Sequence, residues 1–163
     1  MNLLHVVGRK NHGKTTLILD LVAELTRQGR RVGTIKHSSH SHELDTPGKD
    51  SHRQRLAGAD PAAIVACDLI GLYVRRPEGG EYCARLAPLF ADCELVLVEG
   101  DIEGPGPKVE VWRAAMGTPP LAAERAGIAA LISDDEAQLD LPRWPRCDVA
   151  RLAAQALALA AGS

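Results

Sequence analysis

The fold is decided by the stretch Gly8-Arg9-Lys10-Asn11-His12-Gly13-Lys14-Thr15-Thr16, which fits the phosphate-binding pattern G-x-x-x-x-G-K-[ST] without departure. The apolar run over residues 3–7 precedes it and has the length and composition of a buried strand. Apolar residues at helical spacing follow it, and Gly29 stands where a left-handed cap would end that helix. Strand, loop and helix therefore come in the order that phosphate binding by such a loop requires.

The whole stretch from Gly8 to Thr16 is predicted to bind nucleotide phosphates. The free N–H groups of the loop and of the helix N-terminus converge on one place, and both favour a bound anion. Lys14 would reach the outer phosphates and stabilise their charge during reaction, and the Thr15 hydroxyl would coordinate a Mg²⁺ ion that bridges their oxygens. The stretch therefore predicts a nucleotide site with magnesium.

A second landmark is the segment Glu94-Leu95-Val96-Leu97-Val98-Glu99-Gly100, an apolar run that ends in a carboxylate. Continuous apolar runs are typical of buried parallel strands, and an acid at the carboxyl end of such a strand faces the phosphates. Glu99 is therefore predicted to hold Mg²⁺, directly or through water, or to orient the attacking water, as in a Walker B strand. The alternative interpretation is an exposed acid that only ends a strand.

A long polar segment, residues 37–50, follows a predicted strand over residues 31–36. It leaves the carboxyl edge of the sheet, where open parallel sheets bind ligands, so it is placed to close over nucleotide or to present a second substrate. Asp45 and Asp50 would orient water, Asp45 would also join the magnesium shell, and Lys49 would neutralise phosphate charge.

The same charged residues also have a simpler interpretation. Asp45 and Pro47-Gly48 are ordinary turn formers, and Ser51 with Gln54 makes an S-x-x-Q capping box for a helix over residues 51–56. Both interpretations remain open from the sequence.

Three histidines in this segment, His37, His40 and His42, suggest a metal site. A hydrated loop rich in Ser and His needs no ligand, however, and neither a cysteine nor a fixed helical spacing supports a coordination geometry. We therefore favour a loop without a specific metal.

Composition limits the partners that the chain can have. A length of 163 residues suits a single domain over residues 1–163, and 45% hydrophobic residues suffice for a core. The net charge of −2 gives no basic field for nucleic acid or membranes, and 3% aromatic residues argue against a base-stacking platform. The four cysteines form no C-x-x-C pair and no secretory signal is present, so we expect reduced, mostly buried thiols in a cytoplasmic protein.

The remaining elements are predicted from shorter patterns: strands over residues 62–67, 69–74, 108–112 and 127–132, and helices over residues 81–90 and 149–161. Too little chain separates the first two strands for a crossover helix, so they should be antiparallel. Lys108 and Glu110 should share one face of their strand, and Asp148 should cap the last helix. The fold class is therefore α/β, a three-layer α/β/α arrangement with a mostly parallel central sheet and an antiparallel edge.

The sequence does not choose the base of the nucleotide. Ser133-Asp134-Asp135-Glu136 follows the last predicted strand, where related nucleotide folds read the base, but no N-K-x-D guanine signature is present. Asp134 or Asp135 is a candidate acceptor for a guanine edge, although Ser-Asp is also a common helix cap.

Several motifs together resemble the molybdopterin-guanine dinucleotide biosynthesis protein B family, MobB, and the resemblance covers nearly the whole chain. They are Gly8-x4-Gly13-Lys14-Thr15-Thr16-Leu17, Thr34-Ile35-Lys36-His37, Asp45-x-Pro47-Gly48-Lys49-Asp50-Ser51, Gly58-Ala59, Val98-Glu99-Gly100 and Pro107-Lys108-Val109-Glu110-Val111. The first motif is generic, whereas the T-I-K-H strand end followed by the P-G-K-D-S segment is specific.

The resemblance implies a P-loop protein that binds GTP with Mg²⁺, hydrolyses it weakly and forms a homodimer. It implies an accessory role beside the guanylyltransferase that joins GMP to molybdopterin in molybdenum cofactor maturation, with molybdopterin itself as a candidate ligand. Lys36, Lys49 and Lys108 join the phosphate loop as candidate nucleotide-binding residues.

One departure from the family pattern concerns charge. Family members often follow the Glu-Gly pair with Phe-Lys, whereas Asp101-Ile102 follows Gly100 here. If that lysine holds an anionic substrate, Lys108 or Arg53 must replace it. Two other functions remain as alternatives: a nickel-delivery GTPase of related fold, suggested by the histidines, and a small-molecule kinase.

Overall fold

The computed structural model describes residues 1–77 and 82–162. It divides into two compact units, one formed by Met1–Ser38 with the chain from Pro88 onward, and one formed by Ser39–Ala87. Each unit is described by itself. The prediction of a single domain over residues 1–163 stays a prediction.

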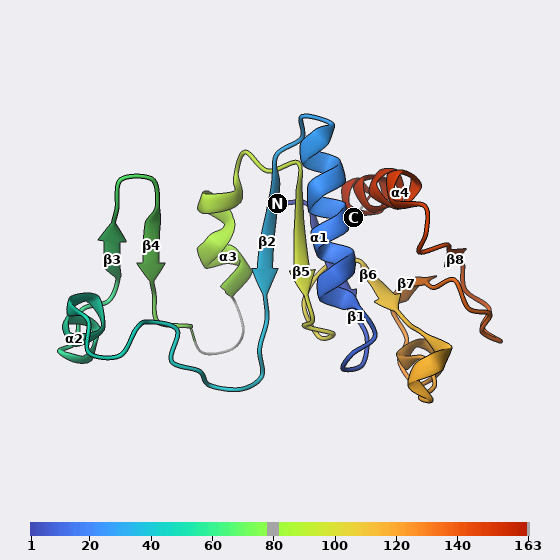
Figure 1. The fold of residues 1–163 in the computed structure, drawn as a ribbon, viewed down its shortest axis with the longest axis horizontal. Coiled ribbons are helices and arrows are strands. Elements are labelled where there is room, and N and C mark those ends of the chain that lie inside the picture. Colours follow the sequence, from blue (N-terminus) through green and yellow to red (C-terminus); the bar gives the residue numbers. More distant parts are fainter. Residues whose placement is uncertain (78–81, 163) are drawn as a thin grey trace. The chain divides into compact units, whose positions relative to one another are not determined.

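The larger unit is built on a six-stranded sheet in the order β2-β5-β1-β6-β7-β8. Every neighbouring pair in it is parallel. The strands are β1 (Leu3–Val7), β2 (Val32–Lys36), β5 (Leu95–Glu99), β6 (Lys108–Val111), β7 (Ile128–Ile132) and β8 (Arg143–Trp144). Figure 1 shows that β5, the strand that ends in Glu99, lies beside β2. The phosphate-loop strand β1 therefore has β5 on one side and β6 on the other.

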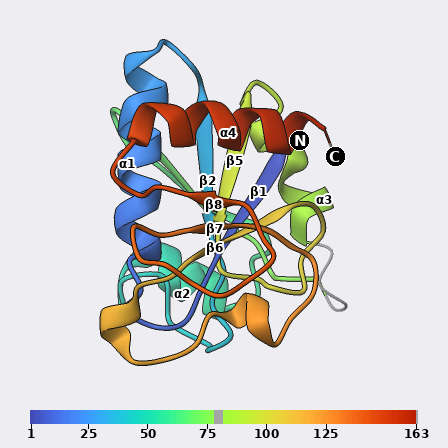
Figure 2. The same ribbon diagram turned by 90° about the vertical axis from the view of Figure 1, so that its right-hand side faces the viewer.

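Two long helices pack on one face of this sheet. The helices α1 (Lys14–Arg27) and α4 (Val149–Ala161) contact each other, and Figure 2 shows α4 lying across the strands beside α1. Their apolar side chains meet those of the strands in one core, which includes Leu4, Leu17 and Leu152, all almost fully buried. Burial of such side chains is the main force that holds the helices to the sheet.

The predicted end of α1 and both predicted ends of α4 are confirmed. Gly29 has a φ of 78°, the left-handed conformation that stops α1. Asp148 caps α4, because its carboxylate accepts a hydrogen bond from the N–H of Arg151 at 3.0 Å.

On the opposite face of the sheet, the loop before β6 and a short 3₁₀ turn, η4 (Leu121–Ala123), contact β1 and β6. Nε2 of the fully buried His5 lies 2.7 Å from the carbonyl oxygen of Pro105. The carboxylate of Glu110, also fully buried, accepts hydrogen bonds from the N–H groups of Leu121 and Ala122 at 2.6 and 2.8 Å. Burial raises the pKa of Glu110, and these two hydrogen bonds oppose that rise.

The smaller unit contains the predicted antiparallel pair, β3 (Ala62–Val65) and β4 (Ile70–Tyr73). The α/β fold with a mostly parallel sheet and an antiparallel pair is therefore confirmed, with the pair in a two-stranded sheet of its own. The helix α2 (Asp50–Leu56) precedes the pair and α3 (Tyr82–Leu86) follows it. The predicted helix over residues 81–90 is α3 continued by the 3₁₀ turn η2 (Ala87–Phe90), and residue 81 lies outside the described residues.

Two local predictions were wrong. The residue that caps α2 is Lys49, without a side-chain cap bond, and Ser51 already lies inside the first turn, so the Ser51–Gln54 capping box does not form. The cysteines are free, as predicted, but they are not mostly buried. Cys67 and Cys147 are exposed, because one lies at the hairpin turn and the other just before α4, while Cys83 and Cys93 are partly exposed.

A search of residues 1–77 and 82–162 finds no helix with the length and apolarity to span a bilayer.

Candidate functional site

The phosphate loop joins β1 to α1 at the carboxyl edge of the sheet. Gly8 has a φ of 143°, and a Cβ atom there would lie 2.5 Å from the carbonyl oxygen of Val111, so only glycine fits. Gly13, with a φ of 99°, occupies the N-cap of α1. Both glycines of the motif are therefore required by the backbone.

A cavity of about 500 Å³ opens over this loop. Its lining consists of Lys10, Asn11, Gly13, Lys14, Thr15, Thr16, Glu99 and Arg113. The structure thus brings six residues of the predicted loop together with Glu99, the acid that ends β5. A helix N-terminus and two lysines in one cavity favour a bound polyanion.

The Lys14 side chain folds back over the loop. Its Nζ donates hydrogen bonds to the carbonyl oxygens of Gly8 and Arg9 at 2.9 and 2.8 Å. Burial lowers the pKa of Lys14, the charge of Glu99 opposes this shift, and the charge of Lys36 adds to it. The ammonium group is therefore held at the place where a phosphate chain in the loop would meet it.

Thr15 and Glu99 form the oxygen-rich side of the cavity. Oγ1 of Thr15 donates a hydrogen bond to Oε1 of Glu99 at 2.9 Å, and Nζ of Lys36 lies 3.9 Å from the same oxygen. Hydroxyl and carboxylate oxygens are ligands that Mg²⁺ prefers, so this pair fits a magnesium ion beside the phosphates. Lys36, at the end of β2, lies beside this pair but is not among the residues that line the cavity, so its binding role stays a prediction.

Arg9 and His12 belong to the loop but point away from the cavity. His12 is almost fully buried; its Nδ1 accepts a hydrogen bond from the N–H of Arg113 at 3.1 Å, and its Nε2 lies 3.0 Å from Oγ1 of Thr118. Since Nδ1 is an acceptor, the proton is on Nε2 and the imidazole is neutral. Burial, followed by the charges of Lys14, Arg113 and Arg9, lowers the pKa of His12.

Arg9 makes a second attachment of the loop to the segment after β6. It donates to the carbonyl oxygen of Pro119 at 3.2 Å and pairs with Glu124 at 2.6 Å. Arg9 and His12 therefore fix the loop from outside and leave its N–H groups to the ligand.

Lys108 does not line the phosphate cavity. Lys108 is the first residue of β6, and its Nζ donates hydrogen bonds to the carbonyl oxygens of Gly104 and Gly106 at 2.7 and 3.1 Å. In this structure Lys108 stabilises the loop before β6. Its binding role stays a prediction.

The two candidate base-reading acids after β7 are engaged with backbone groups. The Asp134 carboxylate accepts hydrogen bonds from the N–H groups of Arg146 and Cys147, and that of Asp135 accepts one from the N–H of Ala114. These aspartates hold three segments of chain together at the carboxyl edge of the sheet.

Asp45, Lys49 and Asp50 all belong to the smaller unit. Asp45 is 7% exposed, and its Oδ1 accepts a hydrogen bond from the N–H of Thr46 at 2.7 Å. The Asp50 side chain is 93% exposed in the first turn of α2, directly after Lys49. Their predicted action on phosphates and magnesium stays a prediction.

The segment with three histidines is divided between the two units: His37 belongs to the larger unit, and His40 and His42 belong to the smaller one. The rings of His40 and His42 lie edge to face, with centroids 6.2 Å apart. Among residues 1–77 and 82–162, the structure contains no group of three or more His, Cys, Asp or Glu side chains placed to hold a metal ion.

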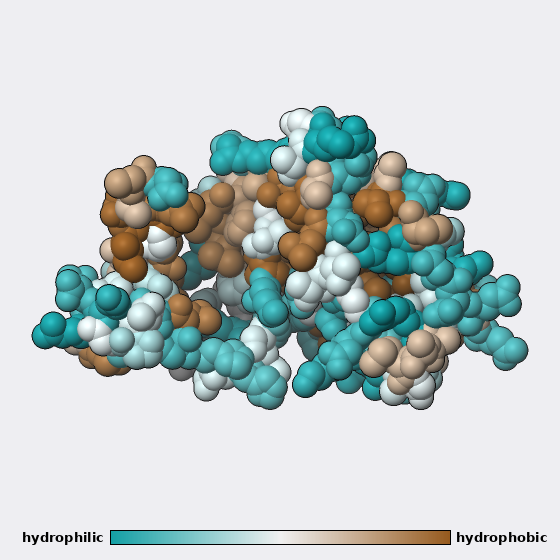
Figure 3. All heavy atoms as spheres, viewed as in Figure 1, coloured by the Kyte–Doolittle hydropathy of each residue, from teal (hydrophilic) through white to brown (hydrophobic). Residues whose placement is uncertain are grey.

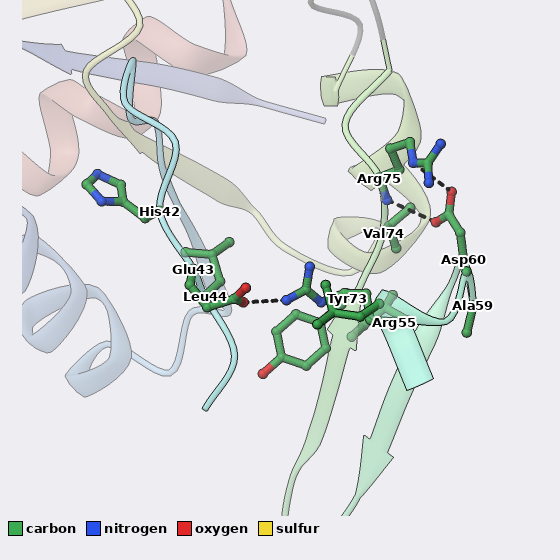
Figure 4. A pocket seen from close by; sticks show the side chains of 12 residues that line it. His42, Glu43, Leu44, Arg55, Ala59, Asp60, Tyr73, Val74 and Arg75 are labelled. Carbon is green, nitrogen blue, oxygen red and sulfur yellow. Dashed lines mark hydrogen bonds and ion pairs between the residues drawn. The ribbon is translucent and has the colours of Figure 1, made fainter. Parts of the chain in front are cut away.

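The smaller unit has a cavity of its own, of about 490 Å³ (Figure 4). Arg55 pairs with Glu43 and lies over the Tyr73 ring, 5.8 Å from its centroid. On the other side the N–H of Arg75 donates to Asp60 at 3.0 Å. The backbone N–H of Asp45, followed by Arg55, lowers the pKa of Glu43 to about 2. The charges that line this cavity are therefore already paired with each other.

Arg113 is the cavity residue that sequence reasoning missed. It follows the strand predicted over residues 108–112, so the rule that ligands bind beyond the carboxyl ends of parallel strands indicates it. The rule applies only once β6 is known to lie beside β1, and no local pattern reveals that neighbour.

Comparison with known proteins matches this arrangement to one family. The family model described as "Molybdopterin guanine dinucleotide synthesis protein B" matches residues 3–134. The chain belongs to the MobB family. A MobB homologue from Bacillus stearothermophilus, solved by X-ray crystallography, is similar over 100% of both chains, with a TM-score of 0.68 and 30% identity.

Two curated relatives carry descriptive names. The molybdopterin-guanine dinucleotide biosynthesis adapter protein of Escherichia coli is 34% identical over 86% of this chain and 83% of its own length. The probable adapter protein of the same name from Bacillus subtilis is 36% identical over 67% of this chain and 64% of its own length. Membership of the MobB family is thus shown by sequence, and the solved homologue has a similar fold.

Proposed function

We propose that this MobB-family chain is a GTP-binding adapter with weak GTPase activity that assists the guanylyltransferase joining GMP to molybdopterin. The observation that carries the proposal is the meeting of Lys14, Thr15 and Glu99 at one cavity over an intact phosphate loop. The names of the relatives support the adapter role over nickel delivery or small-molecule phosphorylation. The cytoplasm stays the predicted location.

Each residue of the cavity has a distinct role in this proposal. The loop N–H groups and Lys14 bind the phosphate chain, while Thr15 and Glu99 would hold Mg²⁺, which neutralises charge that develops on the phosphates. Glu99 also orients the attacking water, and the Lys36 ammonium, 3.9 Å from the Glu99 carboxylate, adds positive charge beside it. The action of Asp45, Lys49 and Asp50 on phosphates and magnesium stays part of this proposal.

We also propose that the protein forms a homodimer through the β3–β4 hairpin. Val65, Leu69 and Ile70 of this hairpin are each at least 70% exposed, and Figure 3 shows apolar surface over it. An isolated two-stranded hairpin is only marginally stable in water, so a second copy of the same apolar face is the cover that suits it. Guanylyltransferase and molybdopterin remain the proposed further partners.

The phosphate site is tested with Lys14→Ala. Removing this charge-assisted contact should weaken GTP binding by about 2 kcal/mol or more in calorimetry, because the ammonium meets the phosphates directly. Arg27→Ala, at a side chain that is 72% exposed on α1, is the matched control and should bind GTP as the wild type does. Unchanged GTP affinity in folded Lys14→Ala protein, or equal affinity for ATP and GTP in the wild type, would contradict the phosphate site or the GTP assignment respectively.

A further inference from the structure

A second, smaller cavity adjoins the phosphate cavity in the larger unit. Its volume is about 240 Å³, and its lining consists of His12, Gly13, Thr16, Val111, Trp112, Arg113, Ile132 and Arg146. Gly13, Thr16 and Arg113 line both cavities. These three residues therefore join the second cavity to the place where phosphates over the loop would lie.

The lining of the second cavity suits an organic group better than a phosphate. Val111, Trp112 and Ile132 contribute apolar side chains at the carboxyl ends of β6 and β7. Arg146 is held at the rim by its ion pair with Asp20 of α1, at 2.5 Å. Apolar walls with a few fixed polar groups are typical of sites for the non-ionic part of a ligand.

Arg113 is fixed at the junction of the two cavities. Its Nη2 donates to the carbonyl oxygen of Asn11 at 2.5 Å, and its backbone N–H donates to Nδ1 of His12 at 3.1 Å. Its Nε lies 4.0 Å from the position that a Cβ atom of Gly13 would take, so the guanidinium lies against the phosphate loop. The edge of the guanidinium is bound to the loop, which orients its flat face.

A guanidinium group held in this way is a good contact for a sugar and a flat base. Its face stacks on aromatic rings through cation–π and dispersion attraction, and its orientation costs little further entropy because the Asn11 carbonyl already holds it. A lysine at the same place reaches the Asn11 carbonyl but presents no planar surface.

We infer that Arg113 contacts the nucleoside half of the bound nucleotide and holds it in the cavity between Trp112, Ile132 and the phosphate loop. This inference rests on the proposed nucleotide site. Arg113, which lies outside the phosphate-binding motif, would then make the protein bind a nucleotide more tightly than a bare phosphate chain.

The test compares two probes, GTP and inorganic tripolyphosphate, on the full chain. Arg113→Lys keeps a donor for Asn11 and removes the flat face, and Arg113→Ala removes both. In each variant the preference for GTP over tripolyphosphate should fall about tenfold, because only GTP has a nucleoside half to lose. In Lys14→Ala both affinities should fall together, and in the Arg27→Ala control neither should change.

The outcomes separate this inference from the proposed function. A preference for GTP that is unchanged in Arg113→Lys and Arg113→Ala overturns the inference, whether both affinities fall together or stay as in the wild type. A wild type that binds GTP no better than tripolyphosphate also overturns it while the phosphate site stands. A wild type that binds neither probe contradicts the proposed function itself. Thermal denaturation of each variant verifies that the protein compared is folded.

Discussion

Glu99 contacts two other candidate residues of the site, Thr15 and Lys36. One of its oxygens accepts the Thr15 hydrogen bond and lies near the Lys36 ammonium. A magnesium ion between Thr15 and Glu99 would exchange this hydrogen bond for two metal–oxygen contacts. The proposed binding of magnesium therefore requires the negative charge of Glu99. The hydrogen bond from Thr15 requires only an acceptor oxygen at the same place.

The prediction at this scale is that Glu99→Gln slows GTP hydrolysis by about tenfold or more and weakens GTP binding much less. The charge acts on metal and water in the transition state, while the amide preserves the shape of the ground state. Glu94→Gln, at the opposite end of the same apolar run, is the matched control and should hydrolyse GTP normally. Hydrolysis in Glu99→Gln equal to that of the wild type, with magnesium present, would reduce Glu99 to an acid that ends a strand.

Sequence reasoning reached much of the site at this scale because two local patterns contain it. The loop motif and the apolar run ending in Glu99 are each continuous in sequence, and the parallel-strand rule places their ends together. The place of Arg113 in the cavity was not predicted, because it depends on which strand pairs with β1. The tertiary partners of Lys108 were equally invisible, since nothing local says that its ammonium binds loop carbonyls.

The bounds of helices and strands were predicted well where apolar residues recur regularly over many residues, and less well where the segment is short. The bounds of α4 agree with the prediction, because an apolar helical pattern lies between Asp148 and Gly162. The strand β8 contains only Arg143 and Trp144, too few residues for any period to show. The cap of α2 was misplaced because the S-x-x-Q pattern indicated Ser51, whereas the observed cap, Lys49, makes no side-chain cap bond that a sequence pattern could reveal.

The helix α4 gives the prediction at this scale. Asp148→Ala should lower the free energy of unfolding by about 1 kcal/mol, because the N–H of Arg151 loses its side-chain acceptor at the helix start. Asp148→Asn keeps an acceptor oxygen and should recover most of that loss. Urea denaturation measures both, and equal losses in the two variants would show that the cap bond is not what stabilises the helix.

At the scale of the whole molecule, the division into two units was not visible in the sequence. Length and composition suggested one domain. A polar segment followed by a short hairpin is equally consistent with a long connection between two strands of a single sheet. The strand order was also out of reach, because local patterns predict strands and do not say which strands pair. The antiparallel pairing of β3 and β4 was predictable only because a short turn joins them.

The hairpin gives the third prediction. Ile70→Lys should convert the proposed dimer to a monomer in sedimentation equilibrium, because a charge would be buried in an apolar interface. Leu19→Lys is the matched control, since Leu19 is 64% exposed on α1 in the larger unit. A wild type that sediments as a monomer, or an Ile70→Lys variant that remains dimeric, would rule out this interface.

The pairing of β1 has a consequence for how the chain reaches its fold. Leu3 pairs with Val96 and His5 with Lys108, so more than half of the chain separates the first strand from both of its neighbours. Contacts this distant in sequence carry a large entropy of loop closure and slow folding, and during synthesis the first strand waits until β5 and β6 have left the ribosome. The phosphate loop, which is the earliest functional segment to be made, therefore acquires its shape among the last, and a chain that ends before β5 contains the complete motif without the means to form its site.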